Sequence, residues 1–187
     1  MHRLELKNQV YLDVAKTISK LSKDENTQVG AVIVSIKGEP ISWGYNGTLP
    51  GMDDNDIPHS RDKKQLVYIE DFKFKIFESD KYPFMEHAEE NALDFGDKSK
   101  MVNATLYVTH MPCAKCARKI VKCGIARVVV ADNPTIDGSS VGCDDDFTKF
   151  WFAQRGVSLY IGDKKINISK PTTQSVAVLT SENVFDF

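Results

Sequence analysis

Residues 105–130 read TLYVTHMPCAKCARKIVKCGIARVVV, and this stretch decides the fold. Apolar and β-branched runs predict strands over 104–109 and 126–131, and apolar residues at helical spacing predict a helix over 113–122 between them. Strands that alternate with helices in this way indicate an α/β sheet with helices packed against it.

The chain before this stretch adds a helix and a hairpin. Apolar residues recur at helical spacing over 3–22 and predict an amphipathic helix whose apolar stripe packs on the sheet. The expected stripe consists of Leu4, Val10, Val14, Ile18 and Leu21. Residues 28–36 and 40–45 are largely apolar or β-branched and flank a Lys37-Gly38 turn, so they predict two paired strands.

Two further helices and a fifth strand complete the predicted sheet. The sequence HAEENALDF from His87 predicts a helix, residues 144–154 predict another, and residues 157–161 predict the strand. Residues 47–86 break the pattern with Gly, Pro, Asp and Asn, which is typical of an insertion or lid. We expect a single domain over 1–164 that carries this insertion, followed by a C-terminal extension of unknown role over 165–187.

Composition and charge narrow the class of partner. The 187 residues are 42% hydrophobic and 27% charged, the balance of a soluble globular protein. The 24 Lys and Arg against 26 Asp and Glu give a net charge of -2, so no overall positive field attracts polymeric nucleic acid or anionic lipid. The first residues lack the apolar core of a secretory signal, and no run approaches the roughly 18 apolar residues of a membrane span. We therefore expect a cytoplasmic protein, not bound to a membrane, with a small-molecule partner.

Two short motifs predict a metal site. His87 and Glu89 form a His-x-Glu motif, and Cys113 and Cys116 form a Cys-x-x-Cys motif that follows Pro112. The two cysteines lie three apart at the start of a predicted helix, so both thiolates can bind one ion at about 2.3 Å, and His87 supplies a third ligand. Three protein ligands leave one tetrahedral position for water, which is the arrangement of a catalytic zinc.

Glu89 lies two positions from His87, which places its carboxylate beside the metal rather than on it. Glu89 is therefore the predicted catalytic residue, and its task is to move protons between water and substrate. The alternative of another class is a structural zinc in a binding or regulatory module. The remaining cysteines, Cys123 and Cys143, are predicted to have no role.

The chain resembles the cytidine deaminase superfamily, and most closely its deoxycytidylate (dCMP) deaminases. The order His-x-Glu and then Pro-Cys-x-x-Cys is the signature of zinc deaminases. QVGAVIV (28–34), GYNGTLPG (44–51) and HAEENAL (87–93) carry the resemblance together with the 105–130 stretch. It implies a three-layer α/β/α sandwich around a mixed five-stranded sheet, and zinc-dependent hydrolysis of dCMP to dUMP and ammonia.

The resemblance also implies the substrate contacts. Asn46 in the GYNG segment would bind the sugar or base, the backbone at Ala88 and at the loop from Thr109 would contact the pyrimidine edge, and Asn91 would reach toward the phosphate or sugar. Asn46 has a plainer interpretation as well, since Asn-Gly after a strand is good turn chemistry. Asn91 is equally interpreted as a solvated helix residue.

The segment 132–142 favours a different substrate. It resembles the loop of purine-type or riboflavin-pathway deaminases, and the Tyr that commonly follows the core strand in dCMP deaminases is missing from VVVAD at 128–132. A deaminase of a purine base or nucleotide, or of tRNA adenosine, is therefore the alternative function. The net charge of -2 disfavours the RNA substrate.

The remaining expectations concern cofactors, subunits and the insertion. We expect one catalytic Zn²⁺ and no second, structural zinc, because residues 47–86 contain no cysteine and only His59. The resemblance implies a homo-oligomer, hexamer or dimer, regulation by dCTP and dTTP, and Mg²⁺ with the regulatory nucleotide. Basic and aromatic residues of the insertion suit a phosphate-binding lid, but an amphipathic strand with one solvated face is the interpretation that we favour.

Overall fold

A mixed six-stranded sheet forms the centre of the molecule. The computed structural model describes residues 3–24, 26–52, 65–69, 75–79, 81–131 and 143–170. The strands in chain order are β1 (Gly30–Val34), β2 (Pro40–Tyr45), β5 (Thr105–Val108), β6 (Arg127–Val130), β7 (Ser158–Ile161) and β8 (Lys164–Ile166). Their order across the sheet is β2-β1-β5-β6-β7-β8. Each of the five predicted strands is present, and β8 adds a sixth.

The sheet combines parallel and antiparallel pairs. β5, β6 and β7 run parallel to one another, as strands joined by crossover helices do. β2 and β5 pair antiparallel with β1, and β8 pairs antiparallel with β7 through a turn at Gly162, whose φ is 55°. β8 begins at Lys164 and continues the sheet across the domain boundary expected there. Its short sequence, KKI, is too polar to predict a strand.

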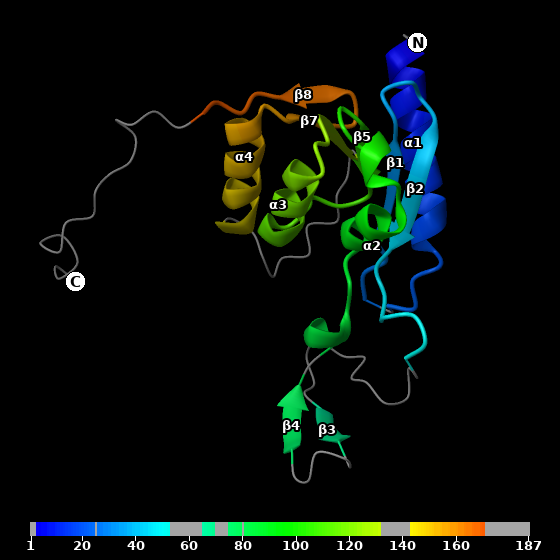
Figure 1. Ribbon diagram of the computed structural model, residues 1–187, viewed down its shortest axis with the longest axis vertical. Coiled ribbons are helices and arrows are strands. Elements are labelled where there is room, and N and C mark those ends of the chain that lie inside the picture. The colour runs from blue at the N-terminus through cyan, green and yellow to red at the C-terminus, as the bar shows by residue number, and fades with distance from the viewer. Residues whose placement is uncertain are drawn as a thin grey trace, which may run out of the picture.

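Helices cover both faces of the sheet, which confirms the α/β/α sandwich. α1 (Arg3–Ser19) lies on one face, and α2 (Ala88–Phe95), α3 (Ala114–Lys122) and α4 (Cys143–Arg155) lie on the other (Figure 1). Successive strand residues alternate between the two cores because side chains on a strand point to opposite faces. In β1, for example, Ile33 packs in the core under α2 and α3, and Val32 packs in the core under α1.

The face of α1 that packs on the sheet is not the predicted one. Asn8, Leu12, Ala15 and Ser19 are its buried residues. Four members of the predicted stripe are 40% to 52% exposed, namely Leu4, Val10, Val14 and Leu21. α1 approaches β1 so closely that a Cβ on Gly30 would collide with the carbonyl oxygen of Ala15. The small Ala15 and Ser19 allow this contact, and Leu4, Val10 and Val14 are turned to solvent.

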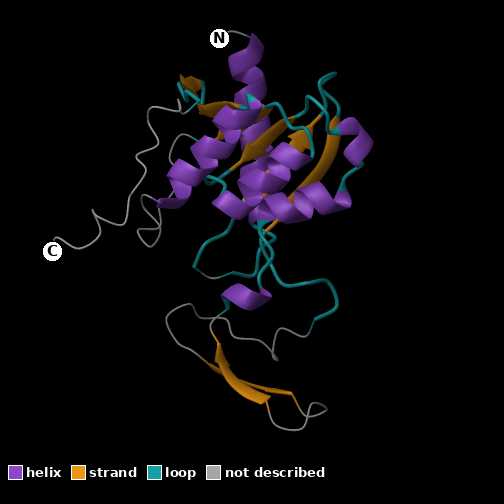
Figure 2. Ribbon diagram, turned by 60° about the vertical axis from the view of Figure 1, so that its left-hand side comes forward, coloured by secondary structure: helices purple, strands orange, loops and turns teal. Residues whose placement is uncertain are grey.

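The described part of the insertion contains a separate hairpin. β3 (Gln65–Ile69) and β4 (Lys75–Ser79) pair antiparallel with each other and lie apart from the main sheet in both views (Figures 1 and 2). The two ends of the insertion meet at a bridge between Gly47 and Glu86, whose backbones exchange hydrogen bonds of 3.1 and 2.8 Å. A 3-10 turn, η3 (Tyr82–Phe84), precedes this bridge, and another, η4 (Lys98–Lys100), follows α2.

No helix in the described part of the chain combines the length and the hydrophobicity that a membrane span requires.

Candidate active site

The N-terminus of α2 places His87 and Glu89. His87 is the N-cap residue, with an extended backbone (φ -77°, ψ 153°), and Glu89 lies in the first turn with only 4% of its surface exposed. α2 packs tightly on β2, where a Cβ on Gly44 would collide with the carbonyl oxygen of Ala88. The first glycine of GYNG is therefore needed for close approach of strand and helix.

The N-terminus of α3 places the two cysteines. Cys113 is the N-cap residue of α3 and is half-buried, and Cys116 lies in the first turn and is buried. The carbonyl oxygen of Pro112, just before them, accepts a 2.8 Å hydrogen bond from the buried hydroxyl of Thr148 on α4. α4 thus holds the segment that leads into the Cys-x-x-Cys motif.

The structure brings His87, Cys113 and Cys116 together as a ligand set. The Nδ1 of His87 lies 3.4 Å from the Sγ of Cys116 and 3.6 Å from the Sγ of Cys113, and the ligand atoms of all three residues lie within 4.8 Å of one another. Sulfur and nitrogen ligands of a tetrahedral zinc lie about 3.6 Å apart, given bonds of about 2.3 and 2.0 Å. The three side chains therefore fit zinc, and the structure brings them together at one point.

Hydrogen bonds among these three side chains shift their pKa values. The hydrogen bond from Cys116 lowers the pKa of Cys113 to about 4, and the bond to Cys113 raises the pKa of His87 to about 9. The pKa of Cys116 is raised, first by its bond to Cys113 and then by burial. Both cysteines lie at a helix N-terminus, where the helix dipole favours the thiolate. A cation in the site would be matched by the Cys113 thiolate, which the lowered pKa of that residue already favours.

Glu89 has the environment of a general acid and base. Burial raises the pKa of Glu89 to about 7, and the nearby His87 opposes this effect. A carboxyl group with a pKa close to neutral can both accept and donate a proton under working conditions. Glu89 lies in the first turn of α2, beside the ligand set, and its role as a proton carrier stays a prediction.

Both polar atoms of the Asn46 side chain, Oδ1 and Nδ2, have hydrogen-bond partners in the protein. Its Oδ1 accepts the backbone N–H of Val29 (2.7 Å), and its Nδ2 donates to the carbonyl of Thr27 (2.9 Å) and to Asp24 Oδ2 (3.4 Å). Asp24 is in turn paired with Lys81, from the end of the insertion. Asn46 thus ties the end of β2 to the segment that leads into β1, and a contact with substrate stays a prediction.

The other predicted substrate residues also have structural contacts. The Nδ2 of Asn91 donates to the carbonyl of Tyr45 (2.8 Å), which fastens the GYNG segment to α2. The Thr109 hydroxyl accepts the backbone N–H of Gly30 (3.1 Å) and lies 2.9 Å from His110 Nδ1. Ala88 is fully buried. The roles of these residues toward a substrate stay predictions.

Sequence reasoning missed the polar residues that support the site. Lys81 and Asp24 form a buried pair, Thr148 holds Pro112, and Glu90 is a fully buried carboxylate next to Glu89. Their partners lie far away in the sequence, so spacing does not reveal them. The one local signal was Glu90, which lies three residues after an N-cap position, where a carboxylate can accept the N-cap backbone N–H.

Several predictions concern residues outside those that the structure describes. The loop 132–142, on which the purine alternative depends, is one of them, and so are His59 and the side chains of the basic and aromatic residues over 61–77. Cys143 begins α4, and its side chain also lies outside the description. Cys123 is half-buried against the apolar core.

Known proteins share this sequence pattern. The profile of the family described as "Cytidine and deoxycytidylate deaminase zinc-binding region" matches residues 6–132. The deoxycytidylate deaminase of Pongo abelii is 32% identical over 121 residues, which are 65% of this chain and 62% of the relative. The probable deoxycytidylate deaminase of Caenorhabditis elegans is 34% identical over 127 residues, which are 68% of this chain and 58% of the relative. The chain thus spans about three fifths of the length of these curated relatives.

Among solved structures, the dCMP deaminase of the cyanophage S-TIM5, in complex with dCMP and dUMP, is similar to this chain. The TM-score is 0.57 and the sequence identity is 25%, over 86% of this chain and 99% of the phage chain.

Proposed function

Because the chain belongs to the family of the cytidine and deoxycytidylate deaminase zinc-binding region, we propose that it hydrolyses dCMP to dUMP and ammonia. The observation that carries the proposal is the group of His87, Cys113 and Cys116 around one point, with the buried Glu89 beside it. A structural zinc in a binding module would not need a buried carboxyl group whose pKa is about 7.

His87, Cys113 and Cys116 would hold the zinc. A zinc ion held there would lower the pKa of a water molecule and so supply the nucleophile of a hydrolytic deamination. Glu89 would accept a proton from the attacking water and deliver protons to the ring nitrogen and to the leaving amine, so that ammonia departs and a carbonyl remains. Burial of Glu89 supports this role, because it brings the pKa of the carboxyl group close to that of a proton carrier at neutral pH.

Three observations support dCMP as the substrate. The relatives from Pongo abelii and Caenorhabditis elegans are named as a deoxycytidylate deaminase and a probable deoxycytidylate deaminase. The similar phage structure was solved in complex with dCMP and dUMP. The GYNG segment lies against α2, the helix that carries Glu89. In this proposal Asn46, Asn91, Thr109 and the backbone at Ala88 line the nucleotide site. Ammonia release from dCMP by the purified, zinc-loaded protein tests the assignment, with adenosine, AMP and guanine as the competing substrates.

Further proposals concern the oligomeric state, the regulation, the insertion and the location of the protein. We infer a homo-oligomer, hexamer or dimer, and regulation by dCTP and dTTP, with Mg²⁺ bound to the regulatory nucleotide. The 47–86 insertion would act as a lid over the site. A cytoplasmic location follows from the cysteines, since thiolate ligands stay available in a reducing compartment. Steady-state curves that stay hyperbolic with and without dCTP and dTTP would remove the regulation.

A further inference from the structure

Glu90 is a buried carboxylate that faces two lysines of another helix. Its side chain is 0% exposed, although it follows Glu89 directly on α2. The Nζ of Lys119 lies 2.6 Å from its Oε1, and the Nζ of Lys115 lies 3.1 Å from Oε1 and 3.3 Å from Oε2. Both lysines belong to α3, and their side chains extend from a partly exposed surface, 60% exposed for Lys115 and 39% for Lys119.

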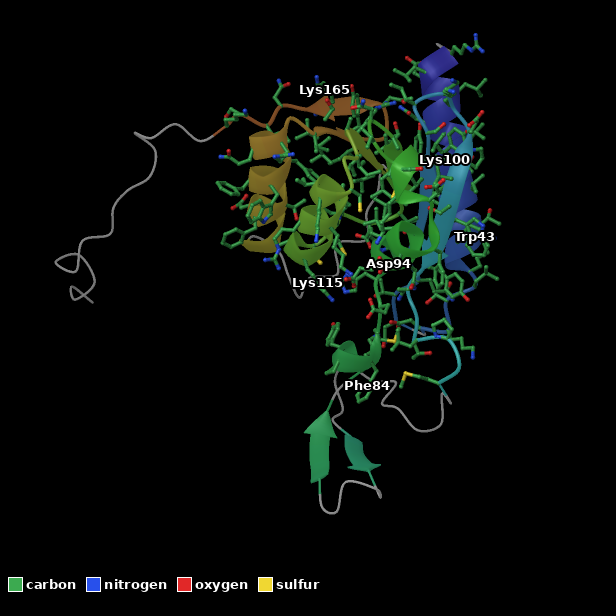
Figure 3. The ribbon with its side chains drawn as sticks, viewed as in Figure 1. Trp43, Phe84, Asp94, Lys100, Lys115 and Lys165 are labelled. Carbon is green, nitrogen blue, oxygen red and sulfur yellow. The ribbon has the colours of Figure 1, made fainter. Side chains whose placement is uncertain are left out.

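These contacts connect the two halves of the metal site. On α2, the Oε2 of Glu90 accepts the backbone N–H of His87 at 3.4 Å, so the carboxylate touches the residue that supplies the nitrogen ligand. On α3, Lys115 lies between Cys113 and Cys116 in the sequence, at the end of the helix beside α2 (Figure 3). One carboxylate therefore joins the helix that carries His87 to the helix that carries both cysteines.

Glu90 has more partners than the neutralisation of its buried charge requires. A single cation would balance one carboxylate, and a buried carboxylate without a partner strongly destabilises the folded protein. Here two ammonium groups and a backbone N–H converge on the same group.

We propose that Glu90, Lys115 and Lys119 form an ion-pair clamp that sets the separation of α2 and α3 and thereby the affinity of the His87, Cys113 and Cys116 set for zinc. The inference rests on the proposed function, since it concerns the same site. These three are positioning residues, because they act through the ligands. Groups that orient metal ligands in this way typically contribute about 10- to 100-fold to metal affinity.

Zinc affinity measured by competition with a chromophoric chelator tests the clamp without reference to turnover. We expect Glu90→Gln to weaken zinc binding about 10- to 100-fold, and Lys119→Met to weaken it in the same direction. The double variant Glu90→Gln/Lys119→Met should lie within about twofold of the weaker single variant, because both changes break one unit. Lys122→Met is the matched control, since Lys122 is exposed on the same helix, and it should leave the affinity unchanged.

Cobalt substitution separates positioning from mere stabilisation. The visible absorption of Co²⁺ depends on the placement of its ligands, so the spectrum of Lys119→Met should differ from that of the parent, whereas Lys122→Met should reproduce it. Because Lys119 is partly exposed, we expect Lys119→Met to fold, so it can be measured even if Glu90→Gln does not fold. Zinc affinities within about twofold of the parent, with unchanged cobalt spectra, would overturn the clamp.

The two proposals fail separately. A parent protein that leaves dCMP untouched, with clamp variants that still lose zinc affinity, contradicts the substrate and supports the clamp. A parent that deaminates dCMP, with clamp variants that bind zinc as tightly as the parent does, contradicts only the clamp.

Discussion

The Nζ of Lys81 lies 2.6 Å from the Oδ2 of Asp24, and the two side chains are only 6% and 5% exposed. Lys81 belongs to the end of the insertion, shortly before His87, and Asp24 precedes β1. Asp24 also accepts backbone N–H bonds from Asn26 (2.9 Å) and Thr27 (3.2 Å). The pair therefore fastens the segment that leads into the metal site to the chain that leads into the sheet.

Lys81→Met leaves the Asp24 carboxylate buried without its cation. Removal of one partner of a buried pair typically destabilises a protein by about 3 to 5 kcal/mol. We expect a loss of this size in the free energy of unfolding, measured with urea on the zinc-loaded protein. Lys98→Met is the control, because Lys98 and Asp94 form an exposed pair on the surface and such pairs contribute at most about 0.5 kcal/mol. Equal effects of the two substitutions would contradict the importance of the buried pair.

Some features of the fold and of the site could be predicted from the sequence and others could not, for physical reasons. The strands over 30–34, 105–108 and 127–130 were predictable because each is a short apolar run bounded by turns. The buried face of α1 was not, since periodicity reveals an apolar stripe but does not show that the small Ala15 and Ser19 permit closer packing. The metal ligands follow from local spacing, whereas the contact between Lys81 and Asp24 joins residues that are distant in the sequence.

Glu89→Gln should abolish proton transfer and keep the metal. Gln has nearly the same shape as Glu but cannot accept the proton, and general acid and base catalysis typically contributes about 100- to 10,000-fold. We expect kcat for dCMP to fall by at least about 100-fold, while zinc analysis still finds one ion per chain. Glu39→Gln, an exposed residue between β1 and β2, is the control and should retain the parent activity. Loss of zinc in Glu89→Gln would instead indicate that Glu89 is a ligand.

Removal of the metal should cost both activity and stability. A site that binds zinc in the folded state and not in the unfolded state stabilises the protein by mass action. Chelation should therefore stop turnover and lower the midpoint of urea unfolding, and Zn²⁺ at one equivalent should restore both. Cys116→Ser should resemble the chelated protein, and Cys123→Ser, outside the ligand set, should resemble the parent. Full turnover after exhaustive chelation would speak against a catalytic zinc.

The loss of folding stability at low pH should depend on Glu90. The pKa of Glu90 is about 2 in the folded protein against 4.5 ordinarily, because Lys119 and Lys115 outweigh the effect of burial. The unfolded chain therefore binds more protons between these values, and the free energy of unfolding falls as the pH drops through this window. Glu90→Gln removes this contribution, so its stability should fall less steeply than that of the parent.

Urea unfolding in the presence of a chelator, at several pH values from about 5 to 3, measures this difference. The chelator keeps metal release out of the comparison. Asp24, whose pKa is lowered by Lys81 against the effect of burial, is present in both proteins and does not affect their difference. Parallel curves for parent and Glu90→Gln would show that the pairing of Glu90 does not contribute.

A substrate panel with the purified, zinc-loaded protein shows directly whether the zinc site deaminates dCMP. Products would be separated by chromatography, and ammonia would be measured in parallel with dCMP, AMP, adenosine and guanine as substrates. We predict that dCMP yields dUMP and ammonia in equal amounts, that the reaction stops in Glu89→Gln, and that the purine substrates are unchanged. An untouched dCMP, with conversion of a purine by the same preparation, would contradict the account.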